Sequence, residues 1–147
     1  MKVRFQQLHP RALLPAHAVS GDAGMDLCCL DEFSLEPEER LLVATGLAVE
    51  IPTQHAGLVL PRSGLALKHG ITLANSPGLI DSGYRGELKL ILVNTDARTP
   101  FHAEAGTRVA QLVVIGFSTV EAEWASDLSV SERDQGGFGS TGVEPNS

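Results

Sequence analysis

The chain has 147 residues, of which 43% are hydrophobic, and its formal net charge is −7 at pH 7. This length suits one domain with its own core, and the charge disfavours a nucleic-acid polymer as a partner, although not a single nucleotide. Apolar runs are shorter than the roughly 20 residues of a membrane helix, and the N-terminal residues lack the apolar core of a signal peptide, so we expect a cytoplasmic protein without a membrane partner.

Short segments of strand character follow one another between turn residues, which include 15 glycines and 8 prolines. The segments are rich in Val, Ile and Leu and are bounded by Gly, Pro, Asn or Asp, as strands are. Only residues 65–69 have the pattern of a helical turn. The predicted strands are residues 3–7, 25–29, 41–51, 58–60, 87–94, 108–115 and 119–124. This order predicts an all-β fold, a sandwich or barrel with one short helix.

The only two cysteines, Cys28 and Cys29, are adjacent in the second predicted strand. A disulfide between neighbours would be strained, and two thiols do not form a zinc site. We therefore expect both to be reduced packing residues. The five histidines have no metal-ligand spacing either.

Residues 61–66 read Pro-Arg-Ser-Gly-Leu-Ala, ending one predicted strand and beginning the helical turn. Arg62, the Ser63 hydroxyl and the backbone N–H groups that follow are suited to binding an anion. An ordinary turn between a strand and a helix has the same composition, so this segment alone leaves both interpretations open.

Residues 75–87 read Asn-Ser-Pro-Gly-Leu-Ile-Asp-Ser-Gly-Tyr-Arg-Gly-Glu, which resembles a hairpin with one carboxylate, Asp81, at its tip. The only tyrosine of the chain, Tyr84, follows three residues later. An aspartate in a turn is usually a turn former. Segments of phosphate-binding composition on both sides favour a functional carboxylate instead. After this segment, residues 87–90 alternate in polarity and residues 90–93 are all apolar, which predicts burial on both faces of the strand there.

Composition changes near Ala125, and residues 126–147 contain few apolar side chains. This predicts a β-domain over residues 1–125 and a flexible Gly-rich arm over residues 126–147, which orders only by docking. Residues 137–142 match G-x-G-x-x-G, but no βαβ unit follows and the lysine of a P-loop is missing, so neither nucleotide-binding fold is indicated. The glycine-rich backbone with Arg133 still suits phosphate, and a terminal linker is the alternative.

Five segments in order resemble the five motifs of the trimeric dUTPase family: residues 23–27, 61–66, 75–87, 106–112 and 133–142. Each alone is a weak signal, but the ordered set is specific and spans most of the chain. The resemblance implies a jelly-roll-like β-fold and a homotrimer with active sites at subunit interfaces. It also implies that the C-terminal arm of another protomer closes each site as a lid.

The reaction implied by this resemblance is the Mg²⁺-dependent hydrolysis of dUTP to dUMP and pyrophosphate. Asp81 would be the general base that deprotonates water for attack on the α-phosphorus. Asp26 would hold the metal through water, because Mg²⁺ keeps several waters and binds triphosphate oxygens. The product would supply thymidylate synthesis, and removal of dUTP would keep uracil out of DNA.

The other site residues implied by the resemblance bind the substrate. Those that would bind or cover the phosphates are Arg62, Ser63, Gly64, Gln111, Arg133, Gly139, Ser140 and Thr141. Those that would bind the base and sugar are Asn75, Leu79, Ile80, Tyr84, Lys89 and Phe138. Within this second group Tyr84 would stack under the deoxyribose and exclude a 2′-hydroxyl, and Phe138 would cover the uracil.

Several positions leave alternatives open. Asp134 stands where the family usually has glycine, and Leu79 stands where many members have threonine. Arg85 and Glu87 are interpreted as an ion pair or interface contacts, and Arg108 as belonging to an interface or to the site. For Gly24, Gly64, Gly78 and Gly86 the alternative is a role in backbone geometry alone. The competing functions are a dCTP deaminase of the same fold, which uses a glutamate base and lacks this lid, and a non-catalytic nucleotide-binding regulator.

Overall fold

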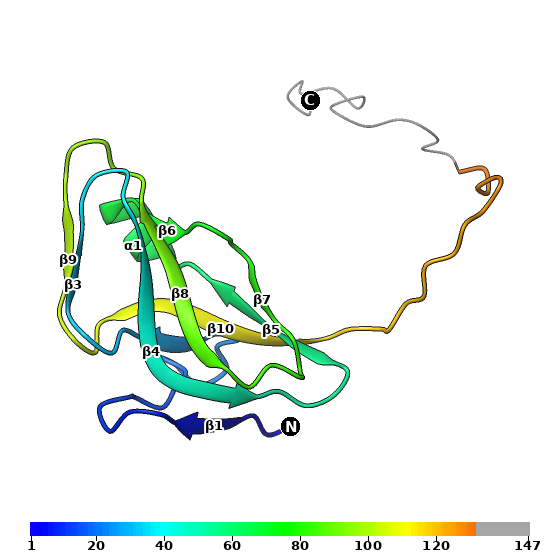
Figure 1. Cartoon of the computed structure of the whole chain (residues 1–147), viewed down its shortest axis with the longest axis horizontal. Coiled ribbons are helices and arrows are strands. Elements are labelled where there is room, and N and C mark those ends of the chain that lie inside the picture. The colour runs from blue at the N-terminus through cyan, green and yellow to red at the C-terminus, as the bar shows by residue number, and fades with distance from the viewer. Residues whose placement is uncertain (132–147) are drawn as a thin grey trace.

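Alternating apolar and polar side chains produce short antiparallel strands in the computed structural model, which describes residues 1–131 (Figure 1). One helix, α1, spans Ser63–His69. It ends at Gly70, whose φ of 66° is the left-handed conformation that favours glycine, and whose N–H donates to the Ala66 carbonyl. The strands are β1 (Arg4–Gln7), β2 (Met25–Cys28), β3 (Phe33–Leu35), β4 (Arg40–Glu50), β5 (His55–Leu60), β6 (Ile71–Leu73), β7 (Gly78–Ile80), β8 (Glu87–Asn94), β9 (Phe101–Ala103) and β10 (Arg108–Gly116).

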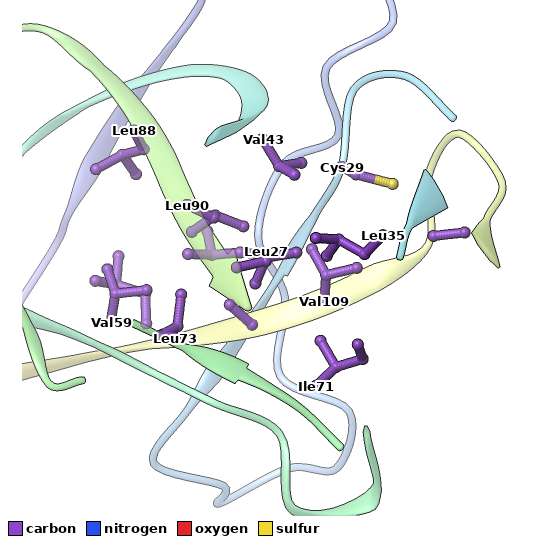
Figure 2. Packing of buried hydrophobic residues seen from close by; sticks show 14 of the residues in the cluster. Leu27, Cys29, Leu35, Val43, Val59, Ile71, Leu73, Leu88, Leu90 and Val109 are labelled. Carbon is purple, nitrogen blue, oxygen red and sulfur yellow. The ribbon is translucent and has the colours of Figure 1, made fainter. Parts of the chain in front are cut away.

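The strands form two four-stranded sheets, ordered β1-β4-β8-β6 and β2-β10-β5-β7, and a small ladder of β3 with β9. Side chains from both sheets share one apolar core, with Leu27 and Leu90 near its middle (Figure 2). Both leucines are almost fully buried. Truncating such a side chain to alanine typically costs about 2–5 kcal/mol, so this core holds the sheets together. The jelly-roll-like β-fold predicted from the sequence is therefore confirmed.

Six of the seven predicted strands are present within a few residues of their expected bounds. The seventh, at residues 119–124, is wrong, because no strand follows β10 within the described residues. The chain runs away from both sheets after β10 (Figure 1), and Val120 and Trp124 are exposed there. The prediction missed β3, β6, β7 and β9, which have three residues each, too few to show a period of two.

The prediction that residues 90–93 are buried on both faces is also wrong. Leu90 and Leu92 are buried, whereas Ile91 and Val93 are only half-buried. The alternation that begins at Glu87 thus continues along the whole of β8, because only one face of this sheet covers the core.

The predicted hairpin around Asp81 is replaced by a connection between the two sheets. β7 pairs with β5, while both edges of β8 are already occupied by β4 and β6. Residues 81–86 therefore carry the chain from one sheet to the other. In Figure 1 this connection lies at the lower right, at the opposite end of the sheets from α1.

The cysteines are free in the described structure, as predicted, with Cys29 buried and Cys28 half-buried. Burial raises the pKa of both thiols above the ordinary value. The Cys29 thiol donates to the Glu104 carbonyl, 3.2 Å away, which requires its protonated form. Among residues 1–131 no helix is long and apolar enough to cross a membrane.

Candidate functional site

An open pocket of about 630 Å³ lies where β5 ends and α1 begins. Arg62 has an extended backbone, and its carbonyl accepts the N–H groups of Leu65 and Ala66 at the start of the helix. Ser63 and Gly64 are exposed in the first turn. The predicted turn from strand to helix is therefore present. Its three residues that are expected to bind phosphate, Arg62, Ser63 and Gly64, all line the pocket.

The register of β10 brings the other predicted residues to this pocket. Gln111 is paired with Asp26 of β2 on one side and with Leu60 of β5 on the other. Its Nε2 donates to the Pro61 carbonyl at 3.0 Å, which fixes the amide beside the turn. A Cβ atom on Gly24 would collide with the Gln111 Oε1, so the absence of a side chain at Gly24 makes room for this amide.

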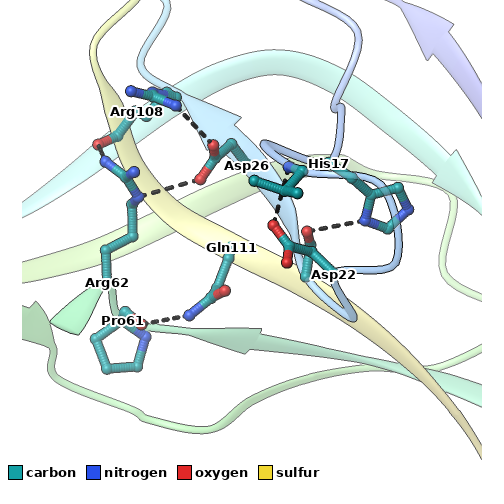
Figure 3. A network of polar contacts seen from close by, with 9 residues as sticks. His17, Asp22, Asp26, Pro61, Arg62, Arg108 and Gln111 are labelled. Atoms are coloured by element: carbon teal, nitrogen blue, oxygen red, sulfur yellow. Dashed lines mark hydrogen bonds and ion pairs between the residues drawn. The ribbon is translucent and has the colours of Figure 1, made fainter.

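Asp26 and two arginines form a network at this pocket (Figure 3). Arg62 Nε lies 3.1 Å from Asp26 Oδ1, and Arg108 Nη1 lies 3.2 Å from Oδ2. Arg62 Nη1 also donates to the Arg108 carbonyl at 3.0 Å. The Asp26 side chain is only 16% exposed, so its interactions are less screened by water than those of surface pairs. Two cations around one anion leave a positive surplus that suits an anionic ligand, and Arg108 belongs to this group.

Three further polar residues line this pocket and were not predicted from the sequence: Asp22, Lys68 and His69. Lys68 follows Gly64 by four residues in α1, so the helical period would have placed both on one face. Asp22 Oδ2 accepts the Val19 N–H at 3.0 Å and closes a turn beside the pocket (Figure 3).

A second pocket, of about 390 Å³, is lined by residues on either side of the connection between β7 and β8. It brings together the predicted residues Leu79, Ile80, Asp81, Tyr84 and Lys89 and adds Glu87. Asn75 is exposed and does not line this pocket. The carboxylate of Asp81 is exposed, and within residues 1–131 it forms no hydrogen bond or ion pair.

Arg85 and Glu87, interpreted from the sequence as an ion pair or as interface contacts, do not pair with each other among the described contacts, and the interface alternative stays a prediction. Arg85 Nη1 instead donates to the carbonyls of Ser82 and Tyr84, at 2.7 and 2.8 Å. Glu87 accepts the Gly46 N–H at 2.9 Å with Oε1, and its Oε2 lies 3.5 Å from Lys89 Nζ. The side chain of Glu87 therefore links β4 to the lysine of the second pocket.

The two pockets share no residue. Figure 1 shows that α1, which borders the first pocket, and the connection between β7 and β8, which borders the second, lie at opposite ends of the sheets. Within a single chain, Asp81 therefore lies in a different pocket from Arg62, Ser63 and Gln111. Within residues 1–131 no three His, Cys, Asp or Glu side chains gather as a metal site. The predicted arm residues Arg133, Phe138, Gly139, Ser140 and Thr141 lie outside the described residues.

Known proteins match this chain over the residues of both pockets. The dUTPase family model matches residues 11–142. A deoxyuridine 5′-triphosphate nucleotidohydrolase of Cutibacterium acnes is 52% identical over 130 residues, covering 88% of this chain and 86% of the relative. The protein of the same name from Wolinella succinogenes is 49% identical, covering 97% of this chain and 95% of the relative.

Solved structures give the same result. The dUTPase of Staphylococcus bacteriophage 80alpha, determined with dUPNHPP, has a TM-score of 0.91 and 30% sequence identity. The match covers 97% of this chain and 99% of the phage chain. A mutant dUTPase of phage phi11 of S. aureus, described with a structural Mg(II) ion, has a TM-score of 0.80 at 24% identity, which shows the fold alone. Its match covers 86% of this chain and 98% of that chain.

Proposed function

Because the chain belongs to the dUTPase family, we propose that it is a dUTP diphosphatase that releases dUMP and pyrophosphate. The observation that carries this proposal is the chemistry of the two pockets. One pocket presents two arginines around a single carboxylate, and the other presents the unpaired carboxylate of Asp81 beside Tyr84. The first pocket suits a polyphosphate, and the second supplies a base and an aromatic surface.

Asp81 acts as the general base in this proposal. Its carboxylate is exposed and has no partner within residues 1–131, so it is available to accept a proton from water. The Tyr84 N–H donates to the Asp81 carbonyl at 3.0 Å and fixes the backbone of the connection. A base held in this way deprotonates the water that attacks the α-phosphorus, an effect typically worth about 10²–10⁴ in rate.

Phosphate binding is assigned to Arg62, Ser63, Gly64 and Gln111, with Arg108 added from the geometry. Asp26 orients both guanidinium groups through its two oxygens. A site with oriented cations stabilises charge on the leaving pyrophosphate without reorganising during the reaction, which is often the largest catalytic contribution.

Mg²⁺ fits these residues only as an ion held mainly by the substrate. Both Asp26 oxygens already contact a guanidinium group, and each has a further lone pair for a water molecule. This donor set suits a water-mediated contact to Mg²⁺, which prefers to keep several waters and to bind phosphate oxygens. When bound, the ion neutralises charge on the triphosphate.

Base and sugar recognition is assigned to the second pocket. β7 is the edge strand of its sheet. Along its outer edge, around Leu79 and Ile80, backbone N–H and C=O groups therefore have no strand partner. These groups, with Lys89 and Asn75, would read the uracil edge. A site that pairs such groups rejects a mismatched base by roughly 10⁴ or more. Tyr84 would stack under the deoxyribose.

A complete site requires more than one chain in this proposal, because the pocket with Arg62 and the pocket with Asp81 share no lining residue and are formed by elements at opposite ends of the sheets. We propose that a homotrimer joins them at its interfaces, as cyclic symmetry allows. Residues 117–131 support an exchange between protomers, since Val120, Trp124, Leu128 and Val130 are almost fully exposed in one chain. The arm, residues 126–147, would continue this exchange and place Arg133, Phe138, Gly139, Ser140 and Thr141 over the phosphates and base.

We propose that the protein acts in the cytoplasm. The reaction there would supply dUMP for thymidylate synthesis and keep uracil out of DNA. The deciding assay incubates the purified full-length protein with dUTP or dCTP, with and without Mg²⁺. We expect pyrophosphate from dUTP only when Mg²⁺ is present. Ammonia from dCTP would indicate a deaminase, and the absence of any product would indicate a nucleotide-binding regulator.

A further inference from the structure

The ring of Tyr84 is folded back over its own chain. Its backbone N–H donates to the Asp81 carbonyl at 3.0 Å, and its hydroxyl donates to the Glu87 carbonyl, also at 3.0 Å. The side chain therefore lies along residues 85–87, while remaining 43% exposed and lining the second pocket. Its position is set at both ends by backbone atoms.

Gly86 lies directly against this ring. A Cβ atom at position 86 would lie 2.6 Å from Tyr84 Cζ and 3.0 Å from Cε2, with the hydroxyl oxygen nearer still. The backbone itself does not require glycine here, because Gly86 is not among the glycines with positive φ. The space needed by the tyrosine ring is the reason for glycine at this position.

The neighbouring Gly83 provides a comparison within the same connection. A Cβ atom at Gly83 would have no other atom within 4 Å, and its φ is also outside the left-handed region. Alanine is thus compatible with the backbone at both positions, and only at 86 does it displace Tyr84.

We propose that Gly86 is a positioning residue for sugar specificity: it leaves the space in which Tyr84 lies flat enough to exclude a 2′-hydroxyl. This inference rests on the proposed dUTP diphosphatase activity. A methyl group at position 86 meets the far end of a flexible side chain, so the ring turns away and the fold is retained. The hydroxyl then loses the Glu87 carbonyl, whereas the Glu87 carboxylate keeps its own partners on Gly46 and Lys89.

The test compares Gly86→Ala with Gly83→Ala in the full chain, measuring kcat/KM for dUTP and for UTP. We expect Gly86→Ala to lower the preference for dUTP over UTP by roughly 10- to 200-fold, the range for loss of one steric contact in a pocket. Gly83→Ala should keep the wild-type preference. An unchanged preference in Gly86→Ala would overturn the proposal.

A double-mutant cycle separates positioning from a general structural role. If Gly86 acts through the ring, Tyr84→Ala and Tyr84→Ala/Gly86→Ala should have equal preferences, because no ring remains to be displaced. A further loss of preference for dUTP over UTP in the double variant would show that position 86 needs glycine for another reason. A double variant that fails to fold while Tyr84→Ala folds would show the same.

A spectroscopic measurement is independent of activity. Tyr84 is the only tyrosine, so ring-¹³C-labelled tyrosine gives NMR signals from one side chain. These signals should shift in Gly86→Ala and stay in place in Gly83→Ala, and unshifted signals in Gly86→Ala would overturn the proposal. Failure of the wild-type protein to hydrolyse dUTP would refute the proposed function, whereas the NMR comparison would still decide whether Gly86 positions the ring.

Discussion

Arg62 Nε lies 3.1 Å from Asp26 Oδ1, although Asp26 lies in β2 and Arg62 lies between β5 and α1, in a different sequence motif. Arg108 occupies the other oxygen of the same carboxylate at 3.2 Å. The aspartate therefore holds two guanidinium groups at the edge of the pocket that Arg62 lines. Because both of its oxygens are occupied in this way, the carboxylate has little capacity left for direct metal binding.

Asp26→Asn is expected to raise the Mg²⁺ concentration for half-maximal activity by about 10- to 100-fold. This range is typical for the loss of a residue that holds a metal through its outer ligands. The measurement is dUTP hydrolysis during a Mg²⁺ titration. Asp31→Asn is the control, because Asp31 pairs with Arg11 and lines neither nucleotide pocket. An unchanged Mg²⁺ requirement in Asp26→Asn would remove this residue from the metal site.

Asp81→Asn should lower kcat by about 10²–10⁴ while leaving nucleotide affinity near that of the wild type. The carboxylate has no partner within residues 1–131, so the free energy of unfolding should change by less than about 0.5 kcal/mol. Single-turnover kinetics, calorimetry with a non-hydrolysable dUTP analogue and thermal unfolding measure these three quantities. A variant that keeps more than half of the wild-type kcat would exclude Asp81 as the base.

Mixed oligomers test whether sites are shared between chains. Asp81→Asn and Arg62→Ala should each be nearly inactive alone, since each damages every site. Coexpressed in equal amounts, they should recover about a quarter of wild-type activity, because a random oligomer forms one intact site from two different chains with that frequency. Light scattering on the same sample should give the mass of a trimer. Mixed oligomers without activity would place Asp81 and Arg62 in one chain's site.

Truncation after Ser131 should leave a folded oligomer with a much lower kcat. The buried core residues run from Leu27 to Leu112 and residues 132–147 contain few apolar side chains, so the thermal midpoint should barely change. Arg133, Phe138 and the glycine-rich backbone are proposed to bind more tightly as charge moves to the leaving pyrophosphate, so kcat should fall and not only KM rise. The full-length protein at equal trimer concentration is the reference. An unaltered kcat would mean that the arm is only a linker.

Local sequence was sufficient for features that depend on neighbours in the chain. The long strands β4, β8 and β10 are rich in Val, Ile and Leu, so their presence could be predicted, and the turn before α1 follows from Pro61 and the residues after it. The motifs likewise identified Asp81, Tyr84 and Arg62 as candidate site residues, because the chemistry of a site depends first on residue type.

Only the tertiary structure decided which of these residues meet. Strand pairing between residues far apart in sequence put Gln111 beside Asp26, moved β7 to a different sheet from β8 and separated Asp81 from Arg62. The reasons for glycine at positions 24 and 86 are the side chains of Gln111 and Tyr84, which approach them in space. Such contacts depend on which strand edges are free for pairing and on which side chains fit together in space. A sequence pattern of short period carries information about neither of these.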